Sequence, residues 1–199
     1  AVDWMLSTDQ KEIEALASEI NTDNTTRRAL DQENTAQALA QITSDPNFDT
    51  QFTTVVYDPN WHKGVVGIVA SRLIETHYRP TIVLTESNGV LTGSARCMQP
   101  LNLYELLEQC QQHLVQFGGH QFAAGLSLLP EHLDAFKDAF ETAVATALSG
   151  QQLQRQIDID TPLEFKELGS NPQLHFPRIL QILSAFEPCG PGNLHPVFV

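Results

Sequence analysis

Basic residues are scarce in this sequence. Lys and Arg together number 11 against 24 Asp and Glu, which gives a formal net charge of −13. Because phosphate contacts dominate nucleic-acid binding and require cations, this balance excludes a broad nucleic-acid-binding surface and leaves room only for a local site. Hydrophobic residues at 42% and charged residues at 18% predict a packed core rather than disorder.

Long apolar runs and cysteine pairs are also missing. No stretch reaches the roughly 18 apolar residues of a membrane helix, and the start lacks a signal-peptide pattern, so we expect no membrane partner. The three cysteines, Cys97, Cys110 and Cys189, include no Cys-x-x-Cys spacing. Reduced thiols in the cytoplasm are the simple interpretation, and the expected location is cytoplasmic.

Apolar periodicity predicts an α/β chain with a boundary near residue 150. Two helices, one from about residue 9 and one from 27 to 42, with a break at the polar run 21–26, would form a helical connector over 1–50. Within 51–150 we expect strands at 53–57, 81–85, 90–96 and 122–129 and helices at 65–76, 101–117 and 131–148. The chain begins without Met and stops on an apolar run, which predicts a piece of a longer protein.

The run Gly93-Ser94-Ala95-Arg96 is a possible phosphate clamp. Side chains alternate along a strand, so Ser94 and Arg96 point the same way and Ala95 points into the core. A hydroxyl beside a guanidinium offers charge-assisted donors to an anion. A strand end with an exposed Arg would show the same residues, and this motif alone favours that plainer interpretation.

A second run, Gly118-Gly119-His120, precedes the small residues Ala123-Ala124-Gly125. Two glycines allow unusual backbone angles, so that consecutive N–H groups could converge on an anion, and His120 adds a donor. A helix C-cap glycine explains one glycine but not the second, nor the histidine. We therefore expect Gly93 to Arg96 and Gly118 to His120 to form one anion site.

A third run, Trp61-His62-Lys63-Gly64, opens a helix whose N-terminus could attract an anion. For Trp61, packing against the sheet is the simpler interpretation. For His62, the sequence favours neither an exposed histidine without a role nor a functional one. No nucleophile with an adjacent base and no metal-ligand spacing is present. Cys97 follows a cation, but a packed thiol is the simpler interpretation.

Taken in order, these runs, together with Arg79-Pro80 and the tail 186–198, resemble the RecJ-type single-strand-specific exonucleases of the DHH phosphoesterase family. The match is to their C-terminal DHH-associated domain and covers nearly the whole chain. The resemblance implies a mixed β-sheet of about five strands flanked by helices. It assigns 1–50 to a helical connector, 51–150 to the substrate-binding domain and 151–199 to the start of an oligonucleotide-binding-barrel region.

The resemblance further implies a 5′ to 3′ exonuclease of DNA repair and recombination that hydrolyses single-stranded DNA with manganese or magnesium. The metals would lie in an N-terminal DHH domain, because no Asp-His-His occurs here, and this fragment would bind no cofactor. By position, the substrate phosphate would contact a set of seven residues, of which His120 would also be catalytic: Ser94, Arg96, Gly118, Gly119, His120, His62 and Arg27.

Two other interpretations remain open. A DHH-family phosphodiesterase for short oligonucleotides or cyclic dinucleotides would share the glycine-rich motifs, although the extension beyond residue 150 favours the RecJ type. A non-catalytic nucleic-acid-binding or structural module, such as the similar domain of alanyl-tRNA synthetases, would suit the net charge of −13.

The 199-residue chain alone should not digest DNA, because positioning a phosphate without metal ions gives no useful rate. Incubation of the purified chain with labelled single-stranded DNA and manganese tests this. We expect intact DNA and weak binding, and detectable manganese-dependent digestion would contradict the prediction.

Overall fold

The computed structural model describes the chain except for residues 1, 152, 156, 165, 167–176 and 191. It contains two compact units, 1–154 and 155–199, which are described separately. Among the described residues, no helix is both long and apolar enough to cross a membrane.

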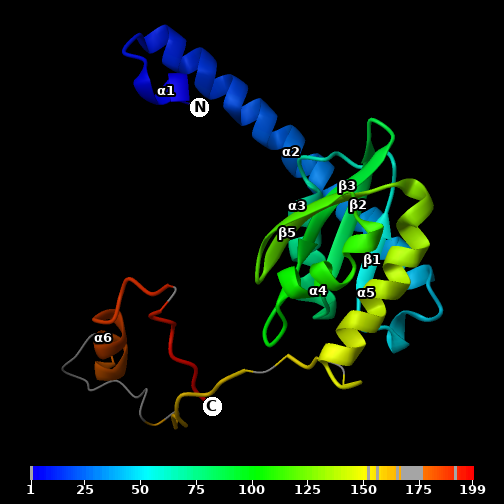
Figure 1. Ribbon diagram of the computed structural model, residues 1–199. Helices are drawn as coiled ribbons and strands as arrows, with labels where there is room; N and C mark the ends of the chain where they lie inside the picture. Colours follow the sequence, from blue (N-terminus) through cyan, green and yellow to red (C-terminus); the bar gives the residue numbers. More distant parts are fainter. Residues whose placement is uncertain (1, 152, 156, 165, 167–176, 191) are drawn as a thin grey trace. The chain divides into compact units, whose positions relative to one another are not determined.

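The N-terminal helices are the short α1 (Val2–Leu6) and the long α2 (Gln10–Ser44), which extends well beyond the sheet (Figure 1). The predicted break at 21–26 is wrong, because α2 continues through it. The hydroxyls of Thr22, Thr25 and Thr26 donate to the carbonyl oxygens four residues earlier, at 2.8–3.1 Å. The helix itself therefore satisfies the polar side chains that would otherwise favour a break.

The first unit is built on five strands in the order β1-β2-β3-β5-β4. Their bounds are β1 (Thr54–Tyr57), β2 (Thr81–Ser87), β3 (Val90–Arg96), β4 (Gln116–His120) and β5 (Ala123–Leu128). β1 pairs with β2 in parallel and all other pairs are antiparallel. The predicted mixed sheet of about five strands flanked by helices is confirmed.

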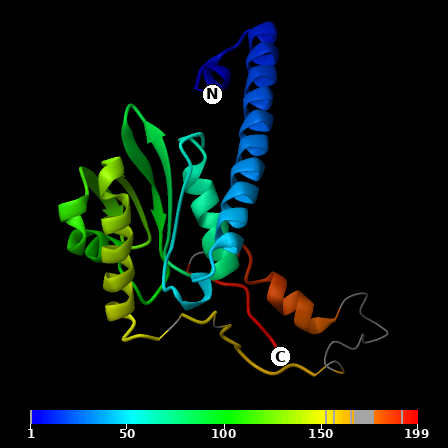
Figure 2. The ribbon, with the colours of Figure 1, turned by 90° about the vertical axis from the view of Figure 1, so that its right-hand side faces the viewer.

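Helices cover both faces of the sheet (Figure 2). α3 (Val66–His77) and the C-terminal part of α2 lie on one face, and α4 (Leu103–Gln109) and α5 (Leu133–Ala147) lie on the other. Three short 3-10 helices complete the unit: η1 (Phe48–Thr50), η2 (Gln111–His113) and η3 (Pro130–His132). The predicted helix 101–117 is too long, since its last residues instead form β4, paired with β5.

Each face has its own core. Leu103 and Leu107 of α4 and Phe136 and Phe140 of α5 pack on one side of the sheet. On the other side, Val69 and Leu73 of α3 pack with Val83, Ala38 and Trp61. Burial of such side chains contributes about 1.5–3 kcal/mol each. The second of these cores holds α3 against β2 and β3, which positions the site described below.

The second unit is small. It contains α6 (Arg178–Ser184), and its two ends meet where Thr161 bridges Phe198 in parallel and Asp160 N–H donates to the Val197 carbonyl at 2.9 Å. These contacts tie the beginning of the unit to its end.

A partly buried histidine lies at the C-terminal end of α3. The His77 ring meets the Phe48 ring edge to face, with centroids 4.9 Å apart, and its Nε2 is buried without a hydrogen-bond partner among the described residues. Arg79 stacks on the same Phe48 ring and donates to the Phe48 carbonyl. Burial, and secondarily the charge of Arg79, lowers the pKa of His77 below its ordinary value.

The chain should therefore lose stability as the pH falls. The unfolded chain binds the His77 proton from about pH 6.5 downward, whereas the folded chain resists it, so stability is lost below the unfolded pKa. We expect the thermal midpoint to fall less between about pH 7.5 and about pH 5 in His77→Gln than in the wild type. His195→Gln, which removes an exposed histidine, is the control, and an unchanged pH dependence in His77→Gln would contradict the prediction.

Candidate functional site

Strand register brings the two predicted motifs together. β5 lies between β3 and β4, and it aligns Ser94 with Gly125 and Arg96 with Ala123. On its other side it aligns Gly125 with Gly118 and Ala123 with His120. Cross-strand partners point to the same face, so Ser94, Arg96, Gly118 and His120 share one face of the sheet, as two neighbouring rows.

This face is open over β4 and β5. α3 covers the face at β2 and β3, whereas Gly118, His120 and Gly125 are exposed. A side chain at Gly118 would meet no atom within 4 Å, and one at Gly125 would meet only the Gly93 carbonyl oxygen, at 3.9 Å. The glycines therefore leave a bare strip of backbone beside Ser94 and Arg96, which a ligand can approach closely.

Gly119 has a different role from Gly118. It aligns with Ala124, whose side chain enters the core under α4 and α5. A Cβ at Gly119 would lie 2.3 Å from the Ala123 carbonyl oxygen. Both glycines belong to a paired strand, whose successive N–H groups point to opposite edges, so the expected convergence of their N–H groups on an anion is wrong.

Arg96 is a half-buried cation without a carboxylate partner among the described residues. Its Nε donates to Ser71 Oγ at 3.3 Å and its Nη1 to the Ala95 carbonyl at 2.9 Å. Burial lowers the pKa of the guanidinium, yet an arginine remains charged at neutral pH. A charge that is removed from water and left unpaired by protein groups is what an anion-binding site requires.

α3 forms the wall of the site beside this pair. A Cβ at Gly67 would lie 3.0 Å from Arg96 Nη2 and 3.2 Å from Ser94 Oγ, so only glycine leaves that space free. One turn later, Ser71 donates to the Gly67 carbonyl at 3.0 Å while accepting from Arg96. Gly67 also lies in the first turn of α3, where the helix dipole favours negative charge.

His120 stands at the exposed end of β4, opposite Arg96 across Ala123. Its Nδ1 accepts from the N–H of Phe122 at 3.4 Å. In the neutral ring the proton is then on Nε2, which can donate to a ligand. No catalytic partner for His120 is found among the described contacts, so its catalytic role stays a prediction.

His62 and Trp61 lie in the loop between β1 and α3. Trp61 is buried and donates from Nε1 to Gln37 Oε1 at 2.7 Å, which confirms the packing interpretation of this tryptophan. His62 is exposed, and its Nδ1 accepts from the Gly64 N–H at 3.1 Å. The loop therefore fixes the direction of the His62 ring without burying it.

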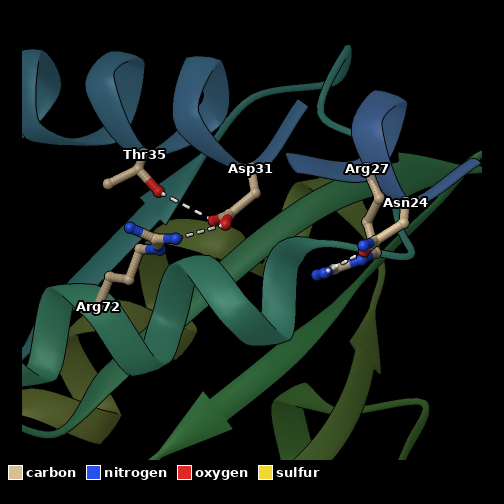
Figure 3. A network of polar contacts seen from close by, with 5 residues as sticks. All are labelled: Asn24, Arg27, Asp31, Thr35 and Arg72. Atoms are coloured by element: carbon tan, nitrogen blue, oxygen red, sulfur yellow. Dashed lines mark hydrogen bonds and ion pairs between the residues drawn. The ribbon is translucent and has the colours of Figure 1, made fainter. Parts of the chain in front are cut away.

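Arg27 belongs to α2 rather than to the sheet. Its Nη2 donates to Asn24 Oδ1 at 2.9 Å, and one turn further along Asp31 pairs with Arg72 of α3 at 2.7 Å (Figure 3). Arg27 and Asp31 project from the same side of α2. The side chain of Asp31 is only 3% exposed, whereas that of Arg72 is 50% exposed, so the ion pair anchors α2 to α3 and thereby sets where Arg27 can reach.

The described residues offer no metal site, and the two buried thiols, Cys97 and Cys110, are not activated. The described residues contain no group of three or more His, Cys, Asp or Glu that could hold a metal ion. Burial raises the pKa of Cys97 and of Cys110 to about 11, so both thiols are protonated at neutral pH. The packed interpretation of Cys97 is confirmed.

Two residues beside the site escaped the sequence analysis. The sequence did indicate that Ser71 lies near the site, because it follows Gly67 by four residues and so lies on the same face of the helix. Asp31 had none, because a charged residue in a helix is expected to face solvent unless a partner is known.

Comparison with known proteins gives consistent similarities. Residues 49–146 match the model of the DHHA1 domain family. The chain is 33% identical over 178 residues, 84% of its length, to the single-stranded-DNA-specific exonuclease RecJ of Haemophilus influenzae, of which it covers 30%. It is 41% identical over 133 residues, 66% of its length, to the protein of that name from Bacillus subtilis, of which it covers 17%.

Solved structures agree with these similarities. The crystal structure of RecJ from Thermus thermophilus in complex with Mg²⁺ matches 98% of this chain with a TM-score of 0.81 and 30% identity. The match covers 29% of that protein. The chain thus spans less than a third of the length of these relatives.

Replacing Gly67 by Ala should close the anion site without unfolding the domain. The new Cβ would fill the space beside Arg96 Nη2 and Ser94 Oγ, whereas alanine loses less backbone entropy than glycine when a helix forms. We expect weaker binding of a 5′-phosphorylated oligonucleotide, measured by NMR titration, with an unchanged or higher thermal midpoint. Gly89→Ala, in the β2–β3 turn, is a control for binding, and undiminished binding by Gly67→Ala would refute the assigned wall.

Proposed function

Residues 49–146 of this chain form a DHHA1 domain, and from this premise we propose that the chain is the substrate-binding part of a RecJ-like exonuclease. The substrate would be single-stranded DNA, degraded from its 5′ end in repair and recombination. The relatives named RecJ carry the description single-stranded-DNA-specific exonuclease, and their similarity extends over 66% to 84% of this chain in the two comparisons above.

The observation that carries the proposal is the unpaired Arg96 beside Ser94 on an open face. Arg96 offers its remaining N–H groups and Ser94 adds a hydroxyl. His120 lies two strands away from Arg96, in the row that Arg96 forms with Ala123. A phosphodiester presents oxygens that accept from such donors. Gly118 and Gly125 let the sugar–phosphate backbone lie against the sheet without a collision.

Divalent metal ions, manganese or magnesium, would be held by a DHH domain outside this chain. The described residues do not fit a metal, whereas RecJ structures have been solved with Mg²⁺ and with Mn²⁺. Metal ions of this kind supply an activated water and stabilise a leaving oxygen. In this chain, Arg96 and Ser94 would fix the phosphate and offset its charge, and His120 would offer a donor at the same phosphate.

Arg27 and His62 would extend the contact surface beyond the sheet. Both are exposed and each is held by one local hydrogen bond, so their side chains are directed without being neutralised by a carboxylate among the described residues. We place them as contacts to flanking phosphates or sugars. Residues 151–199 would continue toward the oligonucleotide-binding region of the longer protein.

A cytoplasmic location completes the proposal. All three cysteines are free, and Cys97 and Cys110 are buried on the core side, where they pack as small apolar groups. Free structural thiols are usual in reducing compartments.

Arg96→Gln tests the function. We expect it to weaken binding of 5′-phosphorylated oligothymidylate by about tenfold or more, since charge-assisted hydrogen bonds contribute about 1.5–3 kcal/mol. The slope of log affinity against log salt, between about 50 and about 200 mM, should decrease in magnitude by about one.

Lys137→Gln removes the same charge from α5, on the other face of the sheet, and is the matched control. NMR titration suits the weak affinity. If Arg96→Gln and Lys137→Gln bind as the wild type does, the site is structural and the proposed function fails.

A further inference from the structure

The α2 helix holds the segment between β1 and α3 with a row of polar side chains. Asn34, Gln37 and Gln41 follow one another at helical spacing and therefore lie on one side of α2. Gln37 Oε1 accepts from Trp61 Nε1 at 2.7 Å, and Gln41 Nε2 donates to the Tyr57 carbonyl at 3.1 Å. Asn34 is only 5% exposed, and a buried amide of this kind requires partners for its polar atoms.

The partners of Asn34 determine which way its amide is turned. The amide lies 3.3 Å from the Leu30 carbonyl oxygen and 3.3 Å from the His62 backbone nitrogen. A carbonyl oxygen only accepts a hydrogen bond and a backbone N–H only donates one, so the orientation of the amide is assigned from these two groups. Nδ2 donates to Leu30, and Oδ1 accepts from the N–H of His62. A buried side chain of α2 thus reaches the backbone of a residue that we place in the substrate contact.

The His62 N–H belongs to a peptide unit that is held at both edges. The opposite edge is the Trp61 carbonyl, which accepts from Thr85 Oγ1 at 2.6 Å, and Thr85 is fully buried in β2. Because the peptide unit is planar, one hydrogen bond to α2 and one to β2 fix the rotation of its plane. This plane is one of the two that meet at the His62 Cα, so it helps to set the direction of the side chain.

The other hydrogen bonds of His62 are local. Its carbonyl accepts from the Val65 N–H at 2.9 Å, and its ring Nδ1 accepts from the Gly64 N–H at 3.1 Å. These bonds shape the loop but would move with it. Among the described hydrogen bonds of His62, only the one to Asn34 ties this residue to another element and so relates the ring to the rest of the domain.

We propose that Asn34 is a positioning residue of the substrate site and acts through His62. Because Nδ1 is occupied as an acceptor, the neutral ring carries its proton on Nε2, the atom that would donate to a phosphate. By holding the His62 N–H, Asn34 keeps this atom available in the exposed loop that leads into α3. The inference rests on the proposed function. Asn34 would contribute to binding without itself touching the phosphate.

A double-mutant cycle of Asn34→Ala and His62→Ala tests the inference, by NMR titration of the 199-residue chain with a short 5′-phosphorylated oligothymidylate. His62→Ala should weaken binding about two- to tenfold, since one neutral hydrogen bond is lost. Asn34→Ala should weaken binding by up to the same factor, and the double variant should bind as His62→Ala does, because Asn34 acts only through the histidine. If the two factors multiply in the double variant, Asn34 acts independently of His62 and the inference is refuted.

Gln41→Ala is the matched control, because it also removes an α2 amide that bonds to a backbone group, the Tyr57 carbonyl. It should bind as the wild type does, and a loss equal to that of Asn34→Ala would refute a specific role for Asn34. The wild-type chain offers a measurement that needs no variant. The His62 amide should exchange slowly with solvent although its side chain is exposed, and exchange at its intrinsic rate would exclude the bond to Asn34.

These measurements separate the inference from the proposed function. If Arg96→Gln weakens binding but His62→Ala or Asn34→Ala does not, the role of Asn34 is refuted and the phosphate site stands. If the wild type binds no oligonucleotide, the proposed function fails and this inference fails with it.

Discussion

The close approach of neighbouring strands at two glycines is the constraint on which the rest of the site depends. A Cβ at Gly93 would lie 2.1 Å from the Val83 carbonyl oxygen, and one at Gly119 would lie 2.5 Å from Ala124 Cα. No side chain can occupy either position while the strands stay paired in this register. The register in turn aligns Ser94 with Gly118 and Arg96 with His120 across β5. The donors Ser94, Arg96 and His120 therefore lie beside the bare backbone of Gly118, because Gly93 and Gly119 carry no side chains that would push the strands apart.

Much of this arrangement could be predicted from the sequence. Apolar strands bounded by turn residues gave β1, β2, β3 and β5 nearly residue by residue, and alternation along β3 placed Ser94 and Arg96 on one face. The two motifs, which lie on β3 and β4, were expected to share one anion site, but neither β4 nor the place of β5 between them was predicted. The strand order that produces it depends on long-range pairing, which local pattern does not encode.

The errors have local physical causes. The polar run in α2 looks like a break because Thr and Asn usually compete with helical hydrogen bonds, but here the threonine hydroxyls bond within the helix. Residues 116 and 117 belong to the predicted helix 101–117, but pairing with β5 makes them part of β4. The role of the two glycines was misjudged for the same reason, since their effect depends on which strand lies beside them.

The length of α2 has a mechanical consequence. Asp31 and Arg72 fasten the helix to α3, and the buried residues of α2 begin at Asp31. From there to Gln10 the helix extends about 30 Å at 1.5 Å per residue. A tilt of about 5° at the Asp31–Arg72 anchor would displace the far end by about 3 Å over that length. A slight change of angle where α2 meets the wall of the site would thus become a displacement of atomic dimensions at the distant end of the helix.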